Sequence, residues 1–388
     1  MTRPREKTID LIKRLVAFDT VSRKSNLALI DFVRDYLDGL GIESRLTHDD
    51  SGVKANLFAT IGPQDRPGIV LSGHTDVVPV EDQPWTADPF AAVERDGKLF
   101  GRGTADMKSF IAVALSLAPE FANARLSAAV HFAFSFDEEV GCVGVPRLIA
   151  DLKRMGLRPK GCIVGEPTEM KVVSGHKGKR SMHCDVRGAA CHSALAPYGV
   201  NAVEIAAEIV TYLRRMGRRF REQGPHDSAF DPPFSTVHTG IMRGGTAINV
   251  VPGACSFDFE FRTLPGHDPV ALLGEVKAFA ERDLIPEMHA VAKDSGIAWS
   301  EASGFPGLDT PEDADIAALA KALAGANATG KVSFGTEAGL FQQDGIPAIV
   351  CGPGSIQQAH KPDEFITLDQ VARCESFLLR LKERLAAA

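Results

Sequence analysis

Apolar residues recur with a helical period near the start of the chain and then give way to short apolar runs. Apolar positions three to four residues apart at 8–18 and 28–40 predict amphipathic helices, because such positions share one helix face. Helical patterns at 109–117 and 145–152 alternate with short extended runs, which lie at 42–46, 56–61, 68–72, 128–136 and 162–165. This alternation predicts the α/β class, with a mixed, mainly parallel sheet flanked by helices.

The middle of the chain follows a different pattern. Residues 181–186, 236–241 and 256–262 alternate polar and apolar side chains, as half-solvated antiparallel strands do, and helical patterns lie at 201–215 and 270–282. After about residue 293 the first rhythm returns, with an apolar run at 348–350 and an amphipathic helix at 368–385. We therefore expect a first domain formed by residues 1–178 and 293–388, interrupted by an α+β insert at 179–292.

Composition excludes several classes of protein. The 388 residues are 44% hydrophobic and 24% charged, with a net charge of −7 and no block of basic residues, so nucleic-acid binding through a basic face is not expected. No apolar run reaches the ~18–20 residues of a membrane span, and residues 1–12 carry charges where a signal peptide is apolar, so a cytoplasmic location is expected. Seven widely spaced cysteines indicate reduced thiols.

Residues that can bind metal follow the apolar runs. The run at 68–72 leads to His74 and Asp76, the run at 128–136 leads to Glu138 and Glu139, and the run at 162–165 leads to Glu166. A glycine-rich turn places Asp106 before a helix, and His360 follows the run at 348–350. Imidazole and carboxylate donors suit zinc, cobalt or manganese, and a shared carboxylate can hold two ions ~3.5–4 Å apart. Each acidic residue alone is also consistent with a helix cap or a turn, but the whole set favours a metal site.

Adjacent Glu138 and Glu139 are expected to divide two roles. Neighbours in an extended segment point in opposite directions, so one can bind metal while the other accepts a proton from water. Asp76 is placed to hydrogen-bond the His74 ring and fix its tautomer. The alternatives are a solvated acidic turn at 138–139 and simple turn formation at Asp76.

Three residues of the insert are further candidates. Arg262 ends a predicted strand and can bind a carboxylate, and the amide of Asn249 can stabilise an oxyanion. His192 precedes a predicted helix and can face a cleft between domains, although a surface histidine is the more ordinary interpretation. The chain lacks the G-x-S-x-G, H-E-x-x-H, P-loop and Rossmann motifs, which argues against serine hydrolase, zincin and nucleotide-binding functions.

Four motifs together resemble a known family. SGHTDVVP at 72–79, GRGTADMK at 101–108, DEEVG at 137–141 and GEPT at 165–168 resemble the dinuclear metallohydrolase family of acetylornithine deacetylase, succinyl-diaminopimelate desuccinylase and carboxypeptidase G. The resemblance covers nearly the whole chain. Within the family, QPWTADPF at 83–90, EEVGC at 138–142, GHKG at 175–178 and GTEAG at 335–339 are similar to the acetylornithine deacetylase branch.

This resemblance implies a role for each candidate. It implies that Asp106 bridges two divalent ions, zinc by preference or cobalt, that His74 and Glu166 complete one site, and that Glu139 and His360 complete the other. It further implies that Glu138 is the general base, that His192 stabilises the tetrahedral intermediate, and that Asn249 and Arg262 bind substrate. The insert would be a lid that mediates a homodimer.

The implied reaction is hydrolysis of the amide of N2-acetyl-L-ornithine, a step of arginine biosynthesis. A desuccinylase, another N-acyl-amino-acid amidohydrolase or a dipeptidase of the same family would use the same metal chemistry. An alternative from another class is a non-catalytic module that binds metal or amino acids, but its expected signature is a damaged donor set, whereas this donor set is complete.

Overall fold

The computed structural model describes residues 3–386, which divide into two compact units. Unit 1 contains the chain up to Gly175, Leu308–Lys331 and the chain from Thr336, and unit 2 contains His176–Gly307 and Val332–Gly335. No helix within residues 3–386 is both long and apolar enough to cross a membrane. The cysteines are free thiols, and all except Cys191 are buried.

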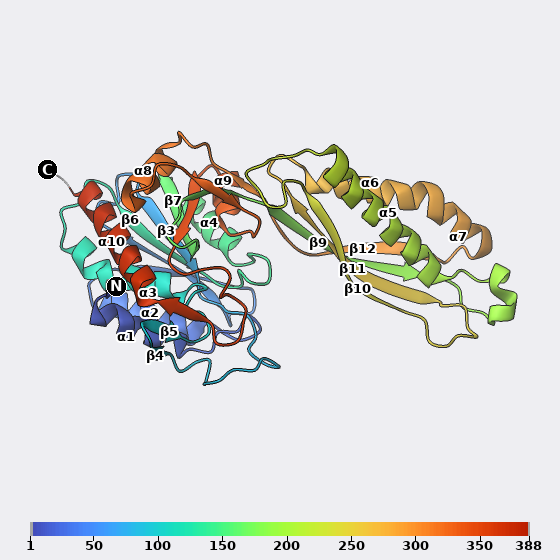
Figure 1. Cartoon of the computed structure of the whole chain (residues 1–388), viewed down its shortest axis with the longest axis horizontal. Coiled ribbons are helices and arrows are strands. Elements are labelled where there is room, and N and C mark those ends of the chain that lie inside the picture. Colours follow the sequence, from blue (N-terminus) through green and yellow to red (C-terminus); the bar gives the residue numbers. More distant parts are fainter. Residues whose placement is uncertain (1–2, 387–388) are drawn as a thin grey trace. The chain divides into compact units, whose positions relative to one another are not determined.

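Unit 1 is built on a mixed sheet with helices on both faces (Figure 1). The strand order is β1-β2-β6-β3-β7-β15-β8-β13, with β14 paired to β8; β3 runs parallel to both β6 and β7, and β7 runs parallel to β15. A smaller sheet has the order β16-β5-β4. Before unit 2 the elements are α1 (Glu6–Val16), α2 (Leu27–Asp38), β1 (Ser44–His48), β2 (Ala55–Ile61), β3 (Ile69–His74), β4 (Val93–Arg95), β5 (Lys98–Phe100), α3 (Lys108–Ala122), β6 (Val130–Ser135), α4 (Val145–Arg154), β7 (Gly161–Pro167) and β8 (Val173–His176). After unit 2 they are β13 (Leu308–Asp309), α8 (Asp315–Ala324), β14 (Gly330–Val332), α9 (Ala338–Gln343), β15 (Ala348–Gly352), β16 (Phe365–Thr367) and α10 (Leu368–Leu385).

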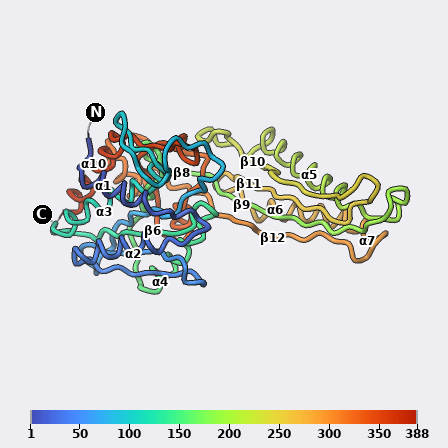
Figure 2. Tube along the Cα trace, turned by 90° about the horizontal axis from the view of Figure 1, so that it is seen from below, coloured from blue at the N-terminus to red at the C-terminus, as the bar shows by residue number. Residues whose placement is uncertain are grey.

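The core of unit 1 follows from the period of two in its strands. Ile69 and Leu71 of β3 join one apolar cluster with α1, α2, α3, α8 and α10, while α4 and α9 lie outside that cluster and contact the sheet elsewhere. Figure 2 shows α1, α3 and α10 side by side, consistent with their contacts. This packing fixes α3 and the sheet as a rigid frame, and the loops at the carboxyl ends of the strands extend from it.

Unit 2 is an antiparallel sheet covered on one face by helices, as Figure 1 shows for α5 and α6. Its strand order is β10-β11-β9-β12. Cys255, Phe257, Phe259 and Phe261 of β11 alternate with more exposed residues and pack under α5. The elements are β9 (Gly178–Arg187), a 3-10 turn (Ser193–Tyr198), α5 (Ala202–Gln223), β10 (Thr236–Gly244), β11 (Ala254–Thr263), α6 (Pro269–Phe279), a π turn (Ala280–Leu284), α7 (Ile285–Val291) and β12 (Gly296–Phe305).

One boundary of the insert differs from the expectation of 179–292. Unit 2 begins close to residue 179, at His176, but it continues to Gly307 and also includes Val332–Gly335. The reason is β12, which pairs with β9 from Gly296 opposite Arg187 to Phe305 opposite Lys179. Residues 296–305 therefore complete the sheet of unit 2 and do not return to the first domain at residue 293.

Candidate metal centre

The candidate residues of unit 1 meet at the carboxyl edge of its sheet. β3 ends at His74, which is paired in register with Ser135 at the end of the parallel strand β6. The chain after β6 carries Glu138 and Glu139, and β7, parallel to β3 on its other side, carries Glu166. Since parallel strands end at the same edge of a sheet, separate segments deliver their side chains to one place.

Asp106 lies between two histidines. Its Oδ1 is 3.0 Å from Nε2 of His74, and its Oδ2 is 3.4 Å from Nε2 of His360. Glu166 Oε1 lies 3.6 Å from Nε2 of His74, and Glu139 Oε2 lies 3.0 Å from Nε2 of His360. One oxygen of Asp106 thus faces each histidine, which is the arrangement of a carboxylate that can bridge two cations.

The donor atoms are close enough for metal binding. Those of His74, Asp106 and Glu139 lie within 4.8 Å of one another, and so do those of His74, Glu138 and Glu166. Imidazole and carboxylate donors in such clusters fit zinc, cobalt or manganese. The second group includes Glu138, so its carboxylate can also reach a metal ion, although the family resemblance implies that Glu138 is the general base.

The electrostatics of the cluster also fit divalent cations. Burial raises the pKa of Glu138 to about 8, and burial together with Asp106 raises the pKa of Glu166 well above its ordinary value. Hydrogen bonds to Asp106 and Glu139 raise the pKa of His360 to about 10. Neighbouring buried carboxylates disfavour one another's ionised forms, and bound cations would remove that penalty.

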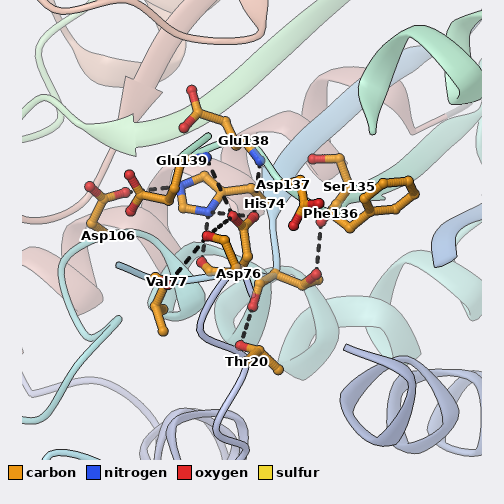
Figure 3. Close-up of polar contacts among 12 residues, drawn as sticks. Thr20, His74, Asp76, Val77, Asp106, Ser135, Phe136, Asp137, Glu138 and Glu139 are labelled. Atoms are coloured by element: carbon orange, nitrogen blue, oxygen red, sulfur yellow. Dashed lines mark hydrogen bonds and ion pairs between the residues drawn. The ribbon is translucent and has the colours of Figure 1, made fainter. Parts of the chain in front are cut away.

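Glu138 and Glu139 point in different directions, as Figure 3 shows. The carboxylate of Glu139 lies beside Asp106 and contacts the His360 ring. The carboxylate of Glu138 instead accepts a weak hydrogen bond from the Cys142 thiol, with Sγ and Oε1 3.4 Å apart. The two neighbours therefore have different partners, with Glu139 tied to the histidine and carboxylate pair.

Asp76 lies within hydrogen-bond distance of the His74 ring through its main-chain oxygen. Nδ1 of His74 lies 2.9 Å from the main-chain oxygen of Asp76 and 3.6 Å from its carboxylate. That carboxylate accepts hydrogen bonds from Ser22 Oγ and from the main-chain N–H groups of Glu138 and Glu139 at 2.7, 3.1 and 3.3 Å (Figure 3). Asp76 thus orients the His74 ring through its carbonyl and fixes the 138–139 backbone through its side chain.

Glu337 is a further buried acid that the sequence did not identify as part of the site. It precedes α9 and accepts hydrogen bonds from Ser72 at 2.9 Å and from Ser135. Burial raises its pKa, and its charge also raises the pKa of Glu138. Glu337 is part of the GTEAG motif at 335–339, which resembles the acetylornithine deacetylase branch, but the sequence analysis did not connect this motif with the metal site.

The three remaining candidates belong to unit 2. His192 and Asn249 are exposed and lie in adjacent segments, because Ser193 N donates to the main-chain oxygen of Asn249 and His192 forms a bridge with Val250. Arg262 lies on β11, and its Nε donates to Glu260 Oε1 at 3.0 Å. The structure brings the loops of His192 and Asn249 together, whereas Arg262 lies on strand β11.

Comparison with known proteins identifies the class. Peptidase family M20/M25/M40 matches residues 70–384. The acetylornithine deacetylase of Myxococcus xanthus is 36% identical over 376 residues, which cover 95% of each chain. The M20 family metallo-carboxypeptidase Sso-CP2 of Sulfolobus solfataricus has a TM-score of 0.78 at 16% identity, over 98% of this chain and 99% of that chain. A Bacillus subtilis structure described as a dinuclear metal binding peptidase of the M20 family has a TM-score of 0.65 at 16% identity, over 97% of each chain.

The chain therefore belongs to peptidase family M20/M25/M40, and it is a metallohydrolase. The family resemblance and the α/β fold expected from the sequence are both confirmed. The buried cluster around Asp106 is its candidate site for divalent metal ions.

Proposed function

We propose that this enzyme hydrolyses the amide of N2-acetyl-L-ornithine and releases L-ornithine and acetate, a step of arginine biosynthesis. The observation that carries the proposal is the 36% identity to the Myxococcus xanthus acetylornithine deacetylase over 95% of both chains. The complete set of donors around Asp106 supports an active enzyme over a binding module that has lost catalysis.

The cluster would hold two divalent ions. Asp106 would bridge them, His74 and Glu166 would complete one site, and Glu139 and His360 would complete the other. Zinc is the preferred metal and cobalt the alternative, since both accept imidazole and carboxylate ligands. Such ions, when bound, supply an activated water at neutral pH and polarise the carbonyl of the substrate.

Glu138 would carry the protons of the reaction. Its carboxylate accepts a weak hydrogen bond from the Cys142 thiol, which leaves an oxygen that would accept a proton from the attacking water and then donate that proton to the departing amine. Asp76 would keep the 138–139 backbone and the His74 ring in place through the contacts described above.

The residues of unit 2 would act on the substrate. An imidazole at His192 and an amide at Asn249 can donate hydrogen bonds to a developing oxyanion. Arg262 uses Nε for Glu260, so its Nη atoms would bind the α-carboxylate of the substrate. We further propose that unit 2 is a lid that mediates a homodimer, and that the enzyme acts in the cytoplasm.

The test is a panel of substrates offered to protein that has been stripped of metal and reloaded with zinc or cobalt. The panel contains N2-acetyl-L-ornithine, N-succinyl-L,L-diaminopimelate, N-acetylmethionine and a dipeptide. We expect kcat/KM to be highest for acetylornithine and to depend on metal. A higher value for another substrate would assign a sibling activity of the family, and a lack of turnover with two ions bound would favour a binding module.

A further inference from the structure

We infer that Glu364 is a positioning residue that sets the affinity of the metal site formed by Asp106, Glu139 and His360. Glu364 immediately precedes β16, four residues after His360, and it is 1% exposed. It belongs to none of the metal-binding motifs, and it touches no donor side chain in the contacts described. Its effect would come from the two loops that it joins. This inference rests on the metal centre proposed above and is independent of the substrate.

Both carboxylate oxygens of Glu364 are used to hold the loop that carries Asp106. Oε2 accepts from Arg102 Nη1 at 2.8 Å and from the main-chain N–H of Gly103 at 3.1 Å. Oε1 accepts from the main-chain N–H groups of Ala105 and Asp106 at 2.8 and 3.1 Å. A carboxylate that accepts four hydrogen bonds in a buried place fixes the path of the loop at Asp106.

The same residue holds the loop that carries His360. Its main-chain oxygen accepts from Gly101 N at 2.8 Å, and its partner Arg102 also donates to the main-chain oxygen of Lys361 at 3.2 Å. Gln83 connects His360 to the same hydrogen-bond network. Its Nε2 donates to the main-chain oxygen of His360 at 3.2 Å, and its Oε1 accepts from Arg102 at 2.7 Å.

These contacts matter because His360 is not held by regular structure. Its φ of 64° lies in the left-handed region, which a residue with a side chain keeps when its surroundings hold it there. The bridging Asp106 is likewise in a loop. By contrast, His74 and Glu166 lie within strands β3 and β7, whose paired backbones hold them without Glu364.

This difference in support predicts a selective effect. If Glu364 becomes a glutamine, its NH2 group faces two of the four N–H donors in either orientation, so half of the hydrogen bonds are lost. The loops of Asp106 and His360 should then loosen together. Second-shell changes of this kind weaken metal binding by about 10–100-fold. We expect the larger loss at the ion of Glu139 and His360, because two of its ligands, Asp106 and His360, lie in these loops. The ion of His74 and Glu166 shares Asp106 alone and should lose less.

The test compares E364Q with E375Q by titrating metal-free protein with Zn²⁺ against a chromophoric chelator. Glu375 of α10 is a matched control, because it is also a buried carboxylate that accepts a main-chain N–H, from Arg5, and a side-chain donor, Thr8. E375Q should bind each of the two ions as tightly as wild type does. E364Q should bind the second ion about 10–100-fold more weakly and the first ion with a clearly smaller loss. In parallel, the electron paramagnetic resonance signal of a coupled Mn²⁺ pair should be present in wild type and E375Q and reduced in E364Q.

Two tight ions in folded E364Q would overturn the inference, and so would an equal loss of both ions. If E364Q fails to fold, Gln83→Ala provides the second test, because Gln83 lies in a surface loop. Gln83→Ala should weaken binding of the second ion more than binding of the first. Unchanged binding of both ions would contradict a role for this hydrogen-bond network. Since the readout is metal binding, it is unaffected if the substrate turns out to be a different N-acyl amino acid.

Discussion

Replacing Glu138 by glutamine should remove most of the turnover and leave both metal ions bound. The change keeps the size of the side chain and removes its capacity to take a proton. Little else depends on that carboxylate, since its described partner is the Cys142 thiol at 3.4 Å and the 138–139 backbone is fixed by Asp76. A positioned general base contributes about 10²–10⁴-fold, so the activation free energy should rise by about 3–5 kcal/mol.

The adjacent variant Glu139→Gln is the natural comparison. Glu139 contacts His360 at 3.0 Å and shares a donor cluster with His74 and Asp106, so E139Q should lose affinity for metal. The assay measures kcat at saturating acetylornithine together with bound zinc by elemental analysis, for wild type, E138Q and E139Q. We expect E138Q to be inactive with two ions and E139Q to be inactive with fewer than two.

Two results would refute this reasoning. Near-normal kcat in E138Q would show that another group carries the proton. Loss of an ion from E138Q, with normal binding in E139Q, would make Glu138 a ligand in the group that it forms with His74 and Glu166, and would exchange the roles of the two glutamates.

Three further predictions concern stability and metal. Burial lowers the pKa of His131 to about 4, below its ordinary 6.5, so the unfolded chain binds a proton that the folded chain excludes; this stabilisation is complete above pH 6.5 and is lost as the pH falls toward 4. In urea unfolding, the free energy of unfolding should therefore fall by about 2 kcal/mol because of His131 when the pH is lowered from 7 to 5. His131→Phe should reduce this pH dependence of stability, and an unchanged pH dependence in the variant would contradict the prediction. Gly165→Ala would place a Cβ 2.0 Å from the Phe110 ring, so the free energy of unfolding should fall by about 1–3 kcal/mol, and an unchanged urea midpoint would disprove the clash. Stripping the metal with a chelator should lower both Tm and activity, because ligands that bind the folded state stabilise it, and added zinc should restore both; a Tm that is indifferent to metal would argue against the buried site.

The sequence could indicate that several candidate ligands of unit 1 lie close together, because His74, Glu138, Glu139 and Glu166 come at or just after the ends of apolar runs. The apolar runs before His74, Glu138 and Glu166 became β3, β6 and β7, and parallel pairing brought their ends together. Asp106 was marked by a glycine-rich turn. Local pattern and global topology agree at these positions.

Other parts of the structure depend on contacts that a local pattern does not reveal. β12 is an edge strand in which Ile297 and Trp299 are followed by small and polar residues, so its apolar pattern is short. The boundary of the insert therefore lies at Gly307 and not near residue 293. The hydrogen bonds from the 138–139 backbone to the carboxylate of Asp76 also join segments that lie far apart in the chain. Glu337 and Glu364 have partners that lie more than 200 residues away in the chain, at Ser72, Ser135 and the 101–106 loop.

The division of unit 1 by unit 2 also determines the order in which the enzyme is made. Asp106, Glu139 and Glu166 leave the ribosome before unit 2, whereas His360 and Glu364 follow it. At about 5–20 residues per second, translation from Glu166 to His360 takes roughly 10–40 s. During that interval the nascent chain contains all proposed ligands of one metal site, whereas the other site still lacks His360. If the proposed site is correct, the second ion would bind only after unit 2 has been translated.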